Sequence, residues 1–298
     1  MPSLNHIHLI APSYPLTEQA IELTKSYFEN LGMRITVPPN LLGEDLLCAN
    51  KDEIRLAHLK HALNDSSADV IWLLQGGYGL TRLIHKLLPM EKPRREKLFI
   101  GCSDGTALHV FLNQFWNWQT LHGPSALTIA KQKVGIQTIE AVLHTARKGF
   151  SHYTPPTLKP FNARSREIFS LSGTLVGGNL CILQCSVGTD WQLNLSDKIL
   201  FLEDVDERGY GVDRMLAHLQ QANMFDDAKA IIFGDFVGGN EPDGASLVPS
   251  VIQRFAENIP LPVFSLPGCG HGDENFPLPF NIQLKFDVEA NRKLKILT

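Results

Sequence analysis

Apolar runs of strand length alternate with helical stretches through the first third of the chain. The runs are His6–Ile10, Met33–Val37, Val70–Leu74 and Leu98–Ile100. Before the third run, Leu56, Leu59 and Leu63 recur at the spacing of an amphipathic helix. Strands that alternate with helices indicate parallel βαβ units, and such sheets bind ligands at the carboxyl ends of their strands. The pattern therefore predicts an α/β fold with its functional residues at one edge of a sheet.

The chain changes character near residue 150. Residues 153–160 are proline-rich and polar, which is typical of a linker between domains. We therefore predict an N-terminal domain at 1–150, a linker at 151–165 and a C-terminal domain at 166–298. In the last of these a glycine-rich segment at 173–180 leads into a predicted helix at 181–187. The sequence further predicts helices at 210–224 and 249–258, strands at 198–203, 230–234 and 262–266, and a closing hairpin at 281–297.

Ser103 follows the fourth apolar run, within Gly101-Cys102-Ser103-Asp104-Gly105, and a predicted helix begins at Thr106. A serine at a sharp strand-to-helix turn exposes its hydroxyl beside a helix N-terminus. The two glycines permit the backbone geometry that such a turn needs. The segment fits the G-x-S-x-G pattern of serine nucleophiles, although it would also fit a serine that caps an ordinary helix.

Glu203 and His271 offer the acid and the base that an activated serine needs. Glu203 ends the predicted strand at 198–203 and opens an acidic run that extends to Glu207. His271 is flanked by glycines in the loop after the strand at 262–266. The chain order Ser103, Glu203, His271 is one of the known orders of a catalytic triad. A solvated strand end and a solvated loop histidine are the alternative interpretations.

Two turns could supply backbone amides for an oxyanion near Ser103. The amide of Asp104 directly follows the serine, and Gly76-Gly77 lies in a second glycine-rich turn after the third apolar run. Turns that follow neighbouring strands fall at the same sheet edge, so both are candidates, although the glycines could equally serve only the turn. Arg82 could bind a substrate carboxylate or form a structural ion pair.

Charge and hydropathy exclude several classes of protein. The net charge of −4 gives no basic surface for nucleic acid, and no apolar run approaches the ~18 residues of a membrane helix. The first ten residues lack the pattern of a signal peptide, so we expect a cytoplasmic protein. The five cysteines lack metal-ligand spacing, and we expect them to be small buried hydrophobes. Neither a metal nor a cofactor is predicted.

Motifs along nearly the whole chain resemble those of the LD-carboxypeptidase family of serine peptidases and of the related microcin-C-resistance peptidases. In the family's order they are Gly76–Gly79, Gly101–Leu108, His122–Pro124, Gly177–Leu180, Leu202–Asp204, Asp213–Leu216 and Gly270–Gly272. The resemblance implies an N-terminal Rossmann-like parallel sheet and a C-terminal α/β domain with a mixed sheet, with the active site in the cleft between them. It places the nucleophile at Ser103, the acid at Glu203, the base at His271 and the oxyanion hole at the amides of Gly77 and Asp104.

The same resemblance implies an activity. It implies hydrolysis of the L,D bond between meso-diaminopimelate and the terminal D-alanine of murein tetrapeptides, in peptidoglycan recycling. The enzyme would be a homodimer that acts on muropeptides, needs no metal or cofactor, and has no nucleic-acid or membrane partner.

Three alternatives are weighed against this activity. The first is a microcin-C-type hydrolase of acyl-adenylate peptides, which the lack of a long insertion near 180–200, where Trp191 is the only aromatic residue, disfavours. The second is an α/β-hydrolase esterase, although the chain lacks the HGGG-type oxyanion loop. The third is a two-lobed, non-catalytic ligand-binding protein, against which an intact Ser103, Glu203 and His271 argue.

Overall fold

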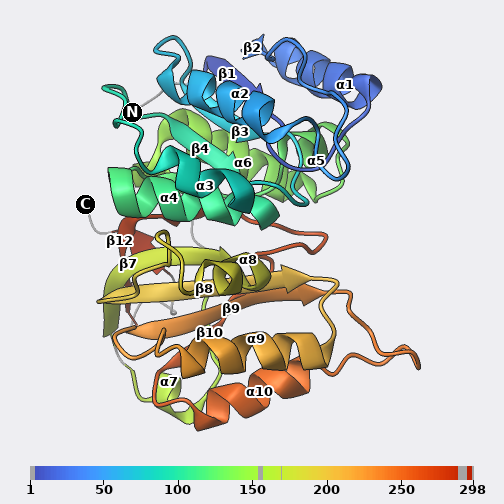
Figure 1. The fold of residues 1–298 in the computed structure, drawn as a ribbon. Helices are drawn as coiled ribbons and strands as arrows, with labels where there is room; N and C mark the ends of the chain where they lie inside the picture. The colour runs from blue at the N-terminus through green and yellow to red at the C-terminus, as the bar shows by residue number, and fades with distance from the viewer. Residues whose placement is uncertain (1–3, 154–156, 169, 288–293, 297–298) are drawn as a thin grey trace.

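Two β-sheets with flanking helices form the molecule. The structure is a computed structural model that describes residues 4–153, 157–168, 170–287 and 294–296. Within these residues the strands form one six-stranded and one seven-stranded sheet. The N-terminal half, blue to green in Figure 1, lies above the C-terminal half, yellow to red. The predicted α/β class is confirmed.

The first sheet is parallel along β5-β4-β3-β1-β2, and β11 joins the β5 edge antiparallel. Its strands are β1 (His6–Ile10), β2 (Arg34–Thr36), β3 (Val70–Leu73), β4 (Leu98–Gly101), β5 (Thr120–His122) and β11 (Leu278–Phe280). The helices of this half are α1 (Glu18–Asn30), α2 (Asp52–Asn64), α3 (Thr81–Leu87), α4 (Thr106–Trp116), α5 (Ala126–Ala130) and α6 (Ile136–Lys148). Every residue of β3 and β4 is buried, as expected for parallel strands covered on both faces.

The second sheet is mixed, with the order β13-β12-β7-β8-β9-β10-β6. Its strands are β6 (Lys159–Pro160), β7 (Ser170–Asn179), β8 (Lys198–Val205), β9 (Ala230–Val237), β10 (Val263–Ser265), β12 (Ile282–Asp287) and β13 (Leu294–Ile296). The helices are α7 (Ala163–Arg166), α8 (Leu180–Ser186), α9 (Gly209–Gln221) and α10 (Val248–Asn258). Strands β7 to β10 are parallel, and β6, β12 and β13 pair antiparallel with their neighbours. The mixed sheet is confirmed, and the turn of the predicted hairpin near Asn291 lies outside the described residues.

The glycine-rich segment at 173–180, to which the sequence analysis assigned neither a strand nor a helix, is extended as far as Asn179. It belongs to β7, a ten-residue strand that pairs with both β8 and β12. Gly177 has a φ of +135°, and a Cβ there would lie 2.0 Å from the carbonyl oxygen of Phe201. Gly177 therefore permits a close approach between strands, a role that glycine also has inside sheets.

The C-terminal segment contributes to both sheets. β11 pairs with β5 of the first sheet, where Leu278 is opposite His122, and β12 follows it directly into the second sheet. The segment predicted as a linker contains β6 and α7, and β6 forms the edge of the second sheet beside β10. The domain boundaries at 150 and 165 stay a prediction.

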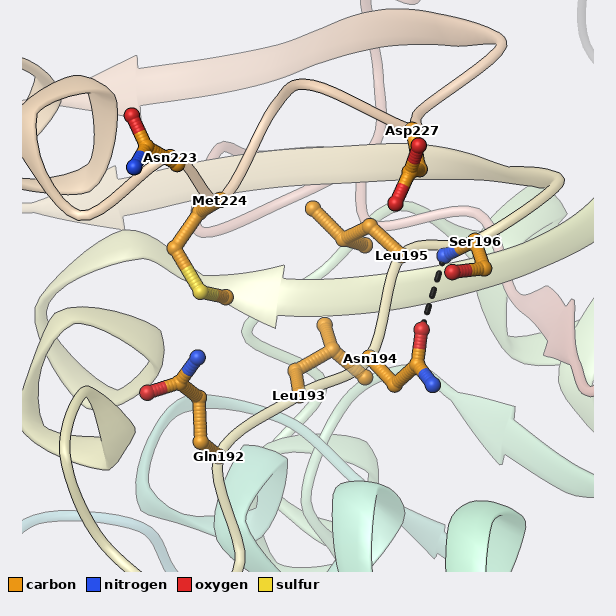
Figure 2. Close-up of a pocket in the computed structure, with 8 residues that line it drawn as sticks. All are labelled: Gln192, Leu193, Asn194, Leu195, Ser196, Asn223, Met224 and Asp227. Carbon is orange, nitrogen blue, oxygen red and sulfur yellow. Dashed lines mark hydrogen bonds between the residues drawn. The ribbon is translucent and has the colours of Figure 1, made fainter.

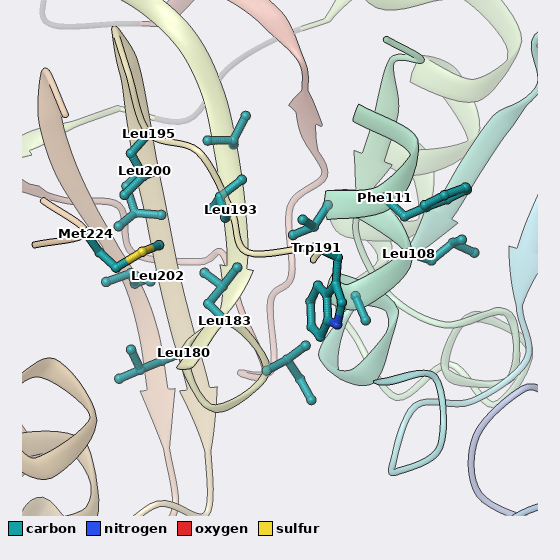
Figure 3. Close-up of a cluster of buried hydrophobic side chains, with 14 of the residues drawn as sticks. Leu108, Phe111, Leu180, Leu183, Trp191, Leu193, Leu195, Leu200, Leu202 and Met224 are labelled. Carbon is teal, nitrogen blue, oxygen red and sulfur yellow. The ribbon is translucent and has the colours of Figure 1, made fainter. Parts of the chain in front are cut away.

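Apolar side chains of the two halves share one buried cluster. Leu108 and Phe111 of α4 belong to it together with Leu180 and Leu183 of α8 and Trp191 of the following loop (Figure 3). Burial of each large apolar side chain contributes about 1.5–3 kcal/mol. Because α4 begins just after Ser103, this contact fixes the Ser103 turn against the second half.

Candidate active site

Ser103 lies on a strained turn between β4 and α4. It opens a short 3₁₀ helix, η1 (Ser103–Gly105), and its φ of +57° is in the left-handed region that non-glycine residues rarely adopt. A Cβ on Gly76 would lie 2.9 Å from the Cβ and 3.1 Å from the Oγ of Ser103. The turn after β3 therefore has to carry a glycine where it faces the serine. Strain of this kind is typical of functional turns.

His271 and Glu203 contact each other directly. His271 Nδ1 lies 2.5 Å from Glu203 Oε2, and the Glu203 side chain is fully buried while that of His271 is 17% exposed. Glu203 was predicted to end its strand, but β8 continues to Val205, and the register with β9 shifts between Leu202 and Asp204. A bulge of this kind re-aims a side chain. The imidazole can therefore reach solvent while the acid cannot.

The charges of this pair stabilise each other. Burial is the largest influence on both pKa values and opposes the charged form of each side chain. Attraction to His271 and hydrogen bonding nevertheless lower the pKa of Glu203 to about 2. Attraction to Glu203 likewise leaves the pKa of His271 above its ordinary value. A carboxylate that stays ionised beside a more basic imidazole suits general-base chemistry.

His122 is a third member of this group that the sequence analysis did not assign. It ends β5, is fully buried, and its Nε2 lies 3.6 Å from Glu203 Oε1. That distance is longer than a hydrogen bond, yet the nearby imidazole still helps to lower the pKa of Glu203. The one signal for His122 in the sequence was its place in the motif His122–Pro124, and that motif did not predict a contact with Glu203.

Two contacts bring the Ser103 turn and the Glu203–His271 pair together. The Asn179 amide at the end of β7 donates to Thr106 Oγ1 over 2.9 Å, and Asn179 pairs with Glu203 in the sheet register. The Cys102 thiol interacts with Asn275. Burial and the Glu203 charge raise the pKa of this thiol to about 12, against the opposing effect of its hydrogen bond with Asn275. Asn275 belongs to the loop of His271.

No hydrogen bond joins Ser103 Oγ to His271 among the residues described. Such bonds are often long in enzymes without substrate and tighten when substrate binds.

The two candidate oxyanion turns are neighbours, as their strand order predicts. Gly76 faces Ser103, and the Leu80 amide at the end of this turn donates to the Asp104 carboxylate over 2.8 Å. Gly77 has a φ of +112°, and in the part of the chain that the structure describes its N–H donates no hydrogen bond within the protein. An unused amide beside a serine can stabilise negative charge on a bound carbonyl.

Arg82 forms an ion pair with Asp52. Its Nε lies 3.1 and 3.0 Å from the two carboxylate oxygens, and its Nη2 lies 2.9 Å from Oδ2. The Asp52 contact raises the pKa of this exposed guanidinium. Of the two roles considered for Arg82, the ion pair is the one that the structure contains.

The expectation that all cysteines are buried is correct for three of them. Cys48, Cys102 and Cys269 are buried, whereas Cys181 is half-buried and Cys185 is exposed, and each is a free thiol. Cys181 and Cys185 are one turn apart on α8, so that their side chains share one helix face. The amphipathic character of α8 therefore decides their exposure.

Two cavities among the described residues lie away from the candidate catalytic side chains. One of about 300 Å³ is lined by Gln192–Ser196, Asn223, Met224 and Asp227 (Figure 2). Another of about 440 Å³ is lined by Gly209, Tyr210, Asp213, Leu247, Ser250, Val251 and Arg254. Neither includes Ser103, Glu203 or His271.

Candidate metal centres and membrane-spanning helices are both absent from the described ranges. No group of three or more His, Cys, Asp or Glu side chains there is arranged to hold a metal ion. Within the same residues, no helix is both long and apolar enough to cross a membrane.

Two family models match the chain. The model of the LD-carboxypeptidase N-terminal domain matches residues 7–123, and that of the LD-carboxypeptidase C-terminal domain matches residues 172–286. A Rickettsia conorii protein that bears a carboxypeptidase name is 37% identical over 97% of this chain and 90% of its own length. The murein tetrapeptide carboxypeptidase of Pseudomonas aeruginosa is 26% identical over 92% of this chain and 90% of its own.

Solved structures share the fold. The muramoyltetrapeptide carboxypeptidase of Oxalobacter formigenes superposes with a TM-score of 0.78 at 24% identity, over 97% of this chain and 98% of its own. An MccF-like protein of Bacillus anthracis superposes with a TM-score of 0.78 at 20% identity, over 100% and 98% of the two chains. At these identities the likeness concerns the fold, which both kinds of peptidase have in common.

Proposed function

The chain belongs to the LD-carboxypeptidase family, and on that basis we propose that it is a serine carboxypeptidase of murein tetrapeptides. It would cleave the L,D bond between meso-diaminopimelate and the terminal D-alanine and leave a tripeptide. The observation that carries the proposal is the buried carboxylate of Glu203 at 2.5 Å from a partly exposed imidazole, on the side of the molecule that faces the Ser103 turn.

The proposed mechanism uses three side chains. His271 accepts the proton of the Ser103 hydroxyl as Oγ attacks the carbonyl carbon, and Glu203 orients the imidazole and stabilises its charged form. The C–N bond then breaks, His271 gives the proton to the leaving amine of D-alanine, and an acyl-enzyme ester remains at Ser103. Water, deprotonated by His271, hydrolyses this ester and regenerates the serine.

The amides of Gly77 and Asp104 would hold the carbonyl oxygen while it carries negative charge. Their turns lie side by side because β3 and β4 are adjacent in the sheet. Loss of one such donor typically costs about 10²–10³ in rate.

The microcin-type alternative is supported by the fold but not by the loop after α8. Trp191, the only aromatic residue at 180–200, is 4% exposed and packs in the apolar cluster with Leu183 and Leu193 (Figure 3). A ring enclosed in this way has no free face for stacking on a nucleobase. The murein peptide is therefore the favoured substrate.

The resemblance to the family also leads us to propose a cytoplasmic homodimer. Light scattering after size exclusion and fractionation of the producing cells would test the two parts. A monomer at all concentrations would remove the dimer from the proposal and leave the chemistry as it stands.

The experiment that tests the activity compares three peptides. We expect a tetrapeptide ending in D-alanine to be cut and the same peptide ending in L-alanine to be a poor substrate. For the peptide ending in D-alaninamide kcat/KM should fall by ~10⁴, because a site built around a carboxylate leaves buried donors unpaired when that group is lost. Products are identified by mass spectrometry. Equal kcat/KM for all three peptides would indicate a general esterase or amidase.

A further inference from the structure

We propose that the carboxylate of Asp104 is a positioning group that fastens both loops around the oxyanion hole to the nucleophile turn, an inference that rests on the proposed serine mechanism. Its Oδ2 accepts a hydrogen bond from Ser13 Oγ at 2.5 Å and a second from the Leu80 amide at 2.8 Å. All three residues are fully buried. This role belongs to the side chain and is separate from that of the Asp104 backbone amide.

The partners of the carboxylate exclude the ordinary explanation for an Asp at this place. An Asp near a helix start usually accepts from amides of its own first turn. Here no side chain caps η1, and the two donors lie 91 and 24 residues away in the sequence. The side chain of Asp104 therefore connects separate segments and does not stabilise its own helix.

Burial of the Asp104 carboxylate is energetically unfavourable. Burial raises the pKa of Asp104 to about 6, against the opposing effects of the Ser13 and Leu80 hydrogen bonds and of the Arg55 charge. Its Oδ1 is buried and has no hydrogen-bond partner among the described residues. An apolar side chain would avoid this desolvation, so the contacts of Oδ2 are the feature that requires an acceptor oxygen here.

Each donor anchors one side of the turn that carries the Gly77 amide. Leu80 ends the turn at 76–79 and is held through its own amide. Ser13 precedes Tyr14, whose amide donates to the Gly76 carbonyl over 3.4 Å and whose ring packs on Gly77, where a Cβ would lie 2.3 Å from Tyr14 Cγ. One carboxylate oxygen thus determines where the Gly77 amide stands relative to Ser103.

The guanidinium of Arg55 contacts the residues that precede Ser13 and Leu80. Arg55 is 1% exposed, donates to the carbonyl of Pro12, and lies against Gly79, where a Cβ would be 2.6 Å from its Nη1. It therefore holds the residue before Ser13 and the residue before Leu80. Small displacements of a catalytic donor, of about 1 Å, can cost 10²-fold in rate.

The test separates positioning from mere stability. Asp104→Ala keeps the backbone amide but removes both anchors, and we expect kcat to fall by about 10²–10³ with KM little changed, because only the transition state uses the oxyanion donors. Asp104→Asn keeps an oxygen that can accept from both donors, so it should restore most of kcat. Ser13→Ala removes one anchor and should cost about tenfold.

Asp69→Ala is the matched control. Asp69 is also a buried carboxylate, 7% exposed, and accepts from the amides of Asn5 and His6 at the opposite end of the strands. It should lower thermal stability without lowering kcat per folded molecule. If Asp104→Ala does not fold, Ser13→Ala decides, and wild-type kcat in that variant would overturn the inference.

Labelling by a fluorophosphonate distinguishes failure of this inference from failure of the proposed function. A wild-type protein that neither hydrolyses the D-alanine peptide nor reacts with the probe at Ser103 would overturn both. A wild-type protein that does both, together with an Asp104→Ala variant that matches Asp69→Ala in kcat and in labelling rate, would overturn the positioning role alone.

Discussion

The two sides of the candidate site are built by different means. On the Ser103 side the backbone conformation positions the functional groups: Ser103 is held at a φ of +57°, and Gly76 and Gly77 leave room for Ser103 and Tyr14. On the other side the side chains have this role: the buried Glu203 carboxylate acts on His271 through its charge, and the buried His122 lies beside Glu203. Backbone conformation sets the position of the candidate nucleophile, whereas the Glu203 charge raises the pKa of the candidate base against the effect of burial.

This difference predicts how each side should respond to mutation. Substitutions that add atoms should be most harmful on the Ser103 side, where close packing leaves no space. Substitutions that change charge while keeping shape should be most harmful around Glu203. The expected loss of kcat is largest for the reacting side chains, smaller for the charge of Glu203, and smaller again for the packing around Gly77.

The largest loss is expected when a reacting side chain is removed. Ser103→Ala and His271→Ala should each lower kcat by up to about 10⁶, and the double variant should be little worse, because the residues act as a unit. Hydrolysis of the D-alanine tetrapeptide is the measurement, with the buried serine Ser165→Ala as control. Turnover by Ser103→Ala close to that of the wild type would exclude the serine mechanism.

A change of charge at constant shape should come next. Glu203→Gln should lower kcat by ~10⁴, because the imidazole loses both its orientation and the charge that stabilises its protonated form. Asp204→Asn is the control, since Asp204 is 3% exposed and accepts from Asn179 and the Cys181 amide. Equal losses in the two variants would mean that Glu203 has only a structural role.

Added atoms on the Ser103 side should have a smaller effect. Gly77→Ala places a Cβ 2.3 Å from Tyr14 Cγ in a backbone at φ +112°, so we expect the amide to shift and kcat to fall by about 10²–10³. Gly32→Ala is the control, because Gly32 also has positive φ (+81°) but open space around its Cβ position. An unchanged kcat in Gly77→Ala would remove Gly77 from the oxyanion hole.

The pH profile should show a modest shift that only the charged side can cause. His271 must be neutral to accept the serine proton, and the Glu203 carboxylate raises the pKa of His271 above its ordinary value, so kcat/KM should fall as the pH drops through this raised pKa. In Glu203→Gln the residual kcat/KM should begin to fall at a lower pH than in the wild type. A limb at the same pH in both proteins would show that Glu203 does not set the basicity of His271.

The smallest expected effect is that of chelation. No metal-binding group is present in the described residues, and the proposed mechanism uses none. EDTA should leave kcat unchanged, with a zinc peptidase as positive control. Inhibition that added zinc reverses would replace the serine mechanism by a metal-dependent one.

The sequence alone determined the elements and the chemistry-bearing positions. The apolar runs before Gly76 and before Gly101 predicted two buried strands whose turns meet at one edge, and the structure contains both. Such predictions succeed because burial of a parallel strand and the glycine need of a tight turn are local properties. The family motifs then singled out Ser103, Glu203 and His271.

Only the tertiary structure decided how these residues act on one another. His122 lies beside Glu203, and Asp104 accepts from Ser13, through contacts between residues far apart in the chain. Residues 173–179 of the glycine-rich segment form part of β7, where Gly177 packs closely against Phe201 of β8. Charge interaction and close packing depend on distance and burial in space, and neither is encoded in the spacing of residues along the sequence.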